Sequence, residues 1–207
     1  MKVSKRYTVE DLNNNKASLL DVYEDYVTEY VLAVAERILK EEHSEIAVVI
    51  LVTSIFEPLG AMIRGAKKGN DSDRFCAGFH FVFGAIPGAQ DPKSAAARVY
   101  RLLRHGLYHE GFLKSGLILV AEGAPISEDG GILRINVGGF LRKTAQQFHV
   151  YVEDVRQSGP DSIKTRDFEA FWVKMQDLKS TGISFDLSAM PMASTAAPIS
   201  TQFVKMR

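Results

Sequence analysis

Apolar residues recur every three or four positions over most of the chain, which is the spacing of one face of an α-helix. The first such stripe comprises Leu19, Leu20, Tyr23, Tyr26, Val27, Tyr30, Val31, Val34 and Ile38. Ser18 and Asp21 have the spacing of a capping box, in which each side chain accepts a hydrogen bond from the other residue's backbone N–H. We therefore expect the first helix to begin after Ser18, and residues 1–17 to form a lead-in.

Three further helices are predicted in the first half of the chain. Residues 44–64 form a long apolar run, in which Pro58 is expected to kink the helix about one turn earlier. A third helix is expected from residue 71 or 72. A fourth is predicted from Asp91, which can cap a helix that begins with a proline, to Gly111.

The pattern changes after this fourth helix. "GLILVAEG" and "GGILRINVGG" indicate two short strands around the turn-rich "APISED", and we expect them to pair as a β-hairpin at about 116–137. Two more helices are expected, from about 140 to 156 and then to about 178. Residues 180–207 are low in charge and have no helical period, so they form an arm or tail. The predicted fold is mainly α: a single domain over residues 18–179, built as an antiparallel helical bundle with a small β-hairpin insertion.

Composition limits the classes of partner. The chain of 207 residues suits one domain, and its 25 basic and 25 acidic side chains balance, so any phosphate-binding surface must be a local cluster. A single cysteine, Cys76, cannot form an intrachain disulfide, and a cytoplasmic location is expected. The apolar run at 46–63 contains Glu57 and Pro58 and is too short for a membrane span, which needs about 20 apolar residues. No membrane association is expected.

Charged and aromatic side chains gather in the fourth predicted helix. Arg101, His105 and His109 are spaced by four and would form a ridge along it, with Arg98 and Tyr108 beside them. The opposite, inward face would consist of Ala96, Val99, Leu102, Leu103 and Gly106. Arginine binds phosphate oxygens in a fork, and histidine transfers protons near neutral pH, so the ridge fits a phosphate ligand. The alternative is a solvated helix face.

The ridge resembles the signature of the HEPN superfamily, the higher eukaryotes and prokaryotes nucleotide-binding domains. That signature is an arginine, usually followed by a polar residue, and a histidine after a gap of four to six residues. Arg104, His105 and His109 match it in this order. The spacing occurs at five places in the chain, but only Arg104 and His109 combine it with the polar residue, the end of a helix and neighbours suited to phosphate.

The resemblance implies a small helical domain that dimerises and, in many members, cleaves RNA without metal in prokaryotic defence or toxin–antitoxin systems. His109 would then remove a proton from a ribose 2′-OH, and Arg104 would stabilise charge on the phosphorane. Arg101, His105, Tyr108 and Arg98 would bind the substrate. The implied partners are a second copy of the chain, RNA and a cognate antitoxin or other protein, with no cofactor and no metal.

Geometry leaves two forms of this site open. Five residues along an ideal α-helix separate two side chains by about 140°, so Arg104 and His109 would not face one substrate. Either the helix is distorted near Gly106, or a two-fold partner supplies the second set of side chains. The competing hypothesis is a non-catalytic helical module that dimerises or binds a partner protein.

Two other local patterns carry weaker implications. His105 and His109 have a zinc-binding spacing, but the sequence offers no third ligand beside them, and we expect no metal site. The glycines of "NVGGF", residues 136–140, precede a predicted helix and either form a strand-to-helix turn or leave room for an anion.

Overall fold

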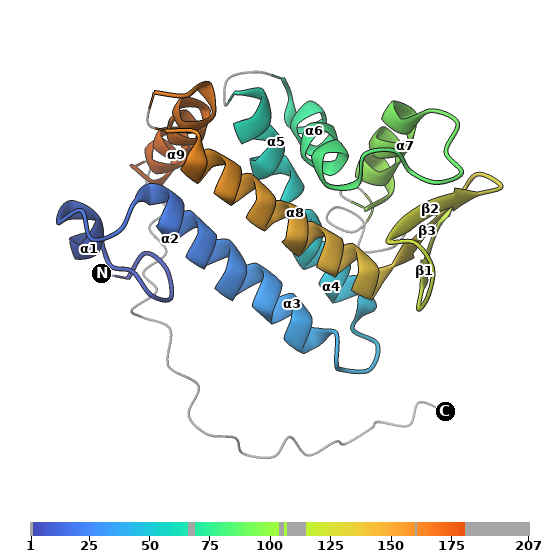
Figure 1. The fold of residues 1–207 in the computed structure, drawn as a ribbon. Coiled ribbons are helices and arrows are strands. Elements are labelled where there is room, and N and C mark those ends of the chain that lie inside the picture. Colours follow the sequence, from blue (N-terminus) through green and yellow to red (C-terminus); the bar gives the residue numbers. More distant parts are fainter. Residues whose placement is uncertain (1, 66–68, 104–105, 107–114, 160, 181–207) are drawn as a thin grey trace, which may run out of the picture.

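The computed structural model describes residues 2–65, 69–103, 106, 115–159 and 161–180. The described part is mainly helical with a small three-stranded mixed sheet at one end (Figure 1), which confirms the predicted class. In chain order the elements are α1 (Val9–Asn13), α2 (Leu19–Tyr26), the π-helix η1 (Val27–Leu32), α3 (Ala33–Ile38), α4 (Glu45–Thr53), α5 (Phe56–Arg64), α6 (Asp71–Phe83), α7 (Pro92–Val99), β1 (Leu117–Val120), β2 (Ile126–Asp129), β3 (Ile132–Asn136), α8 (Val137–Gln157) and α9 (Ile163–Ser180). The antiparallel bundle stays a prediction. The tail at 181–207 lies outside the described residues.

The lead-in is more structured than its sequence indicates. It contains α1, which begins with a capping box formed by Thr8 and Asp11. The backbone N–H of Arg6 donates to Asp25 Oδ2 over 2.8 Å, and its Nε lies 3.1 Å from Asp25 Oδ1. Asp25 is only 6% exposed, so this pairing compensates a buried carboxylate and attaches the lead-in to α2.

The first predicted helix is interrupted by a π-helical segment. It begins at the Ser18 capping box, as expected, but α2 passes into η1 before α3 continues. A π turn holds an extra residue, so it rotates the positions that follow relative to those before it. Tyr26 and Tyr30 are consequently 46% and 43% exposed, although both belong to the predicted apolar face, whereas Leu32 and Ala35 are buried.

The long apolar run divides where Pro58 predicts. α4 ends at Thr53 and α5 begins at Phe56, because a proline lacks the N–H that would bond one turn back and its ring clashes there. Among the described residues, Glu45–Arg64 is the one stretch long and apolar enough to cross a membrane, and 56% of its most apolar window is buried inside the molecule.

The helices α5 and α6 pack with their backbones in direct contact. A Cβ atom added at Gly60 would lie 1.7 Å from the carbonyl oxygen of Arg74, and one added at Gly78 would lie 2.0 Å from that of Phe56. The Phe56 ring is fully buried beside this crossing. Its ring centroid lies 5.4 to 5.9 Å from those of Phe75, Phe79, Phe83 and Phe140 in edge-to-face geometry.

We predict that Gly60→Ala or Gly78→Ala lowers the free energy of unfolding by about 3 kcal/mol or more, since a methyl group would collide with backbone that cannot rotate away. Urea denaturation followed by circular dichroism measures this. Gly138→Ala, in α8, is the control: its added Cβ meets nothing closer than the end of the Arg142 side chain, at 3.2 Å. It is expected to be neutral or stabilising. Equal losses for all three variants would contradict the close packing of α5 and α6.

The predicted hairpin is wrong in its pairing. The strand order is β1-β3-β2, and the two predicted strands, now β1 and β3, run parallel, with Leu117 opposite Leu133. β2 lies within the segment expected to be a turn and pairs antiparallel with β3. The reversal is at Gly130 and Gly131, whose φ angles of 55° and 80° suit a two-residue hairpin turn. After β1, the chain therefore passes across the carboxyl end of β3 before it enters β2.

Asn136 connects this crossing to the next helix. Its side-chain oxygen accepts a hydrogen bond of 2.9 Å from the N–H of Gly139 and caps α8. Its side-chain nitrogen donates to the carbonyl of Gly123 over 3.0 Å. One buried amide thus fixes the end of β3, the start of α8 and the 121–125 loop.

We expect Asn136→Ala to lower the free energy of unfolding by about 2 kcal/mol, because both a helix cap and a buried loop contact are lost. Asn136→Asp keeps the cap acceptor but cannot donate to Gly123, so it should recover part of this loss. Thermal and urea unfolding compare the three proteins. A wild-type stability for Asn136→Ala would show that the amide does not organise this junction.

Candidate functional site

The helix that carries the predicted ridge begins as expected. The Asp91 carboxylate accepts hydrogen bonds from the N–H groups of Lys93 (3.0 Å) and Ser94 (3.2 Å), and a proline occupies the first position of α7. The predicted inward face is confirmed, since all of its members are buried: Ala96, Val99, Leu102, Leu103 and Gly106. The opposite side of the helix is therefore the side left for a ligand.

The backbone after α7 is π-helical. Residues 100–103 and 106 have this conformation. Hydrogen bonds in a π-helix join residues five apart, so residues five apart come close to one another along the helix, as residues four apart do in an α-helix. The described residues around Gly106 thus depart from an ideal α-helix. An arginine–histidine site within one chain requires such a departure.

The ridge residues differ in what the structure describes. Arg101 is exposed and forms no ion pair with any residue in the described ranges. Arg104, His105, Tyr108 and His109 lie outside the described residues. The assignment of these four residues rests on the sequence.

Arg98 is used in a contact with the sheet. Its Nη1 lies 2.6 Å from Glu128 Oε1, and its Nη2 donates to the carbonyl of Gly131. Both partners are in or next to the β2–β3 hairpin, and the two ion-paired side chains are 25% and 15% exposed. In this conformation Arg98 holds α7 against the hairpin, and its guanidinium is engaged by Glu128 and Gly131.

Two other histidines that share the signature spacing have different surroundings. His80 is half-buried in α6 with its ring 6.4 Å from that of Phe79, as expected for a histidine at the edge of the core. His149, on α8, lies with Nδ1 3.5 Å from Glu24 Oε1. Neither contacts the described part of the ridge in these interactions.

Metal and thiol chemistry find no support in the described part of the chain. It contains no group of three or more histidine, cysteine or acidic side chains placed to hold a metal ion. Burial raises the pKa of the Cys76 thiol, whose side chain also hydrogen-bonds Ser72. A raised pKa keeps the thiol protonated and unreactive at neutral pH, as expected of a residue that packs against the core.

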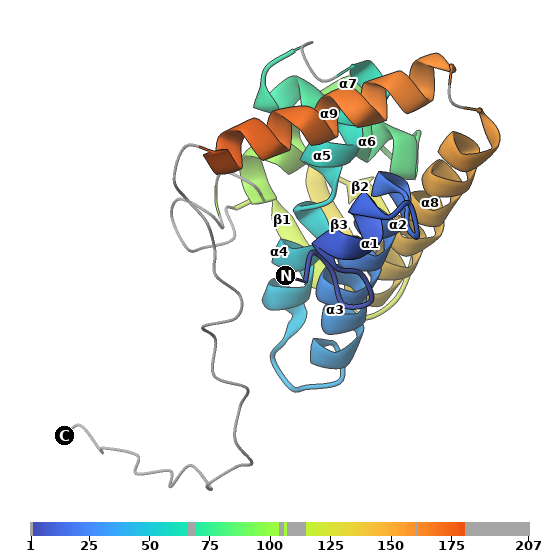
Figure 2. The same cartoon turned by 90° about the vertical axis from the view of Figure 1, so that its left-hand side faces the viewer.

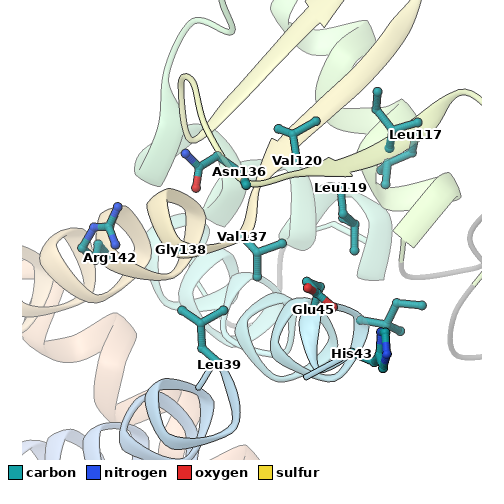
Figure 3. Close-up of a pocket in the computed structure, with 13 residues that line it drawn as sticks. Leu39, His43, Glu45, Leu117, Leu119, Val120, Asn136, Val137, Gly138 and Arg142 are labelled. Carbon is teal, nitrogen blue, oxygen red and sulfur yellow. The ribbon is translucent and has the colours of Figure 1, made fainter. Parts of the chain in front are cut away.

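A groove of about 830 Å³ lies between the sheet and the helices (Figure 3). It is lined by Leu39, His43, Glu45, Ile46, Leu117, Ile118, Leu119, Val120, Ala121, Asn136, Val137, Gly138 and Arg142. None of the described ridge residues is among them. The sequence indicated "NVGGF" only as a turn or anion site. The groove itself was missed, because its walls come from distant segments.

Comparison with known proteins finds no matching family model, no matching curated protein and no matching solved structure.

We predict that Arg98→Gln lowers the free energy of unfolding by about 1 kcal/mol, because a half-buried charged hydrogen bond to Glu128 is lost. Arg101→Gln, one helical turn away and exposed, is the matched control and should change stability by less than about 0.5 kcal/mol. Urea unfolding of the two variants tests the assignment. If Arg98→Gln proves as neutral as Arg101→Gln, Arg98 does not anchor the hairpin.

Proposed function

We propose that the chain is a HEPN-like protein that binds RNA and cleaves it without a metal ion, through Arg104 and His109. The observation that supports this most is the π-helical backbone at residues 100–103 and 106. The main geometric objection to the pair is that five α-helical residues place side chains about 140° apart. A π-helical turn that included both residues would remove that objection, and such turns are frequent at functional sites.

The surroundings of the pair also support the proposal. The inner face of this helix is buried, which leaves its opposite side as the one that can meet a ligand. Arg101 is exposed there and has no ion-pair partner among the described residues, which leaves its charge available to a phosphate. Because the whole chain is neutral, RNA would be held by a few local contacts, and we expect its binding to weaken only modestly with salt, since the salt dependence scales with the number of phosphates contacted.

The proposed reaction is an attack within the RNA strand. His109 accepts the proton of a ribose 2′-OH, and the 2′-oxygen forms a bond to the adjacent phosphorus as the bond to the 5′-oxygen breaks. The leaving 5′-oxygen takes a proton from water or from the second histidine of a dimer. Arg104 stabilises the extra negative charge on the phosphorane. The products are a 2′,3′-cyclic phosphate and a 5′-hydroxyl end.

The biological setting is proposed from the same resemblance. A two-fold homodimer would place two ridge helices beside one RNA strand. A cognate antitoxin or another protein partner and a role in prokaryotic defence are part of this proposal.

The experiment is a cleavage assay on single-stranded RNA with variants of the pair. His109→Ala and Arg104→Ala are each expected to lower the rate by about 10²- to 10⁴-fold, through loss of the base and of the charge that stabilises the transition state. Arg104→Lys should restore little, since an ammonium cannot bind two phosphate oxygens in a fork. A chelator should leave the wild-type rate unchanged.

The controls are His80→Ala and His149→Ala, which share the spacing but not the helix. His149→Ala removes an exposed side chain and should cleave at the wild-type rate; His80→Ala should do so in its folded fraction. Normal cleavage by folded His109→Ala, or no cleavage of any RNA by the wild type, would favour the non-catalytic module. Loss of activity with chelator, restored by zinc, would contradict the metal-free mechanism.

A further inference from the structure

The two edges of the sheet differ in how they are covered by the rest of the chain. The edge of β2 is covered by the 84–91 loop: the backbone N–H of Glu128 donates to the carbonyl of Pro87 over 2.8 Å. The loop lies so close that a Cβ atom at Gly88 would be 1.9 Å from the Glu128 carbonyl oxygen. Exposed edges invite pairing with other chains, and this loop prevents it on the β2 side.

The edge of β1 has no such cover from the described residues. β1 pairs with β3 alone, in parallel register. The N–H of Leu133 donates to the Gly116 carbonyl, so in the parallel ladder it is the alternate residues Ile118 and Val120 that continue the bonding to β3. Leu117 and Leu119 therefore direct their N–H and C=O groups outward, away from β3, and both residues line the groove.

The groove has helices on one side and the free edge of β1 on the other. On the side opposite β1 it is bounded by the end of α3 and the start of α4, with Leu39, His43 and Ile46 in its wall (Figure 3). A single extended chain fits between these helices and the edge of β1. Ile46 and Ile118 are 44% and 41% exposed at its rim, so a bound chain would also cover apolar surface.

One end of the groove carries a positive charge in an unfavourable place. A Cβ atom at Gly138 would lie 3.2 Å from Arg142 Nη1, so the guanidinium lies over the first turn of α8. That turn has no acidic residue, and a helix start is itself partially positive. A cation there costs stability, and Arg142 has no ion-pair partner in the described ranges. A carboxylate would offset both charges.

We propose that the groove binds the free C-terminal segment of a partner protein as an added β-strand on β1, with the terminal carboxylate on Arg142. The direction follows from the register: Val120 pairs with Asn136, so the carboxyl end of β1 lies at the start of α8. A peptide whose C-terminus reaches Arg142 must therefore run parallel to β1. Backbone pairing with β1 would supply affinity. Every second side chain of the peptide would pack against Leu119 and Leu39, and this contact would supply selectivity.

The test begins with a library of random heptapeptides displayed with free C-termini, selected on the full-length chain. An enriched sequence is then synthesised as the free acid and as the C-terminal amide, and both are titrated by calorimetry. We expect the amide to bind about tenfold more weakly or worse. The Arg142→Gln variant should bind the acid and the amide equally. Its melting temperature should equal or exceed that of the wild type, since the positive charge at the start of α8 is removed. Lys143→Gln, the adjacent cation outside the groove, should behave as wild type.

N-methylation of the peptide, one position at a time, tests the strand pairing. Methyl groups at alternate positions should abolish binding, and those between should have little effect, because only every second N–H faces β1. Three results would overturn the proposal: no enriched peptide, equal binding of acid and amide by the wild type, or an even response to N-methylation. None depends on RNA cleavage, so failure here and failure of the proposed function are distinguishable.

Discussion

The close approach of α5 and α6 at Gly60 and Gly78 is the constraint on which the rest of the fold depends. Two helix backbones can touch only where neither carries a side chain, and this contact puts Phe56 at the centre of an aromatic cluster. Phe140 of α8 joins that cluster, so the same crossing positions the helix that follows the sheet. Figure 2 shows α5 and α6 beneath α9, with α8 along the right-hand side and the sheet lower in the centre.

The crossing also determines where the two candidate surfaces lie. The chain leaves α6 through the 84–91 loop, which covers the edge of β2 before α7 begins. Arg98 then attaches α7 to the β2–β3 hairpin, and the edge of β1 is left facing the groove. The ridge helix and the groove thus both depend on how the small sheet is held against the helices.

Features governed by neighbours in sequence could be predicted, and features governed by distant contacts could not. The Ser18 and Asp91 caps and the break before Pro58 follow from chemistry within about one helical turn. The exposure of Tyr26 and Tyr30 follows from a π-helical segment that no local signal marks. The sequence pattern assigned Gly130 and Gly131 to the start of a strand. In the structure they form the hairpin turn between β2 and β3, so the parallel pairing of β1 with β3 was not predicted.

The same division applies to the site. The buried face of the ridge helix was predicted from its period, and it is confirmed. The partner of Arg98 is 30 residues away in sequence, so its contact with Glu128 could not be anticipated from the helix alone. The groove combines segments near residues 39–46, 117–121 and 136–142, and only the fold brings them together.

The most direct measurement of the central claim, cleavage of RNA through its own 2′-OH, is mass spectrometry of products from two matched oligonucleotides. One is unmodified RNA, and the other carries 2′-O-methyl groups at every position. The account predicts that the first yields fragments ending in a 2′,3′-cyclic phosphate and that the second stays intact, because its 2′-oxygens have no proton for His109 to remove. Equal cleavage of both, or fragments without the cyclic phosphate, would contradict it.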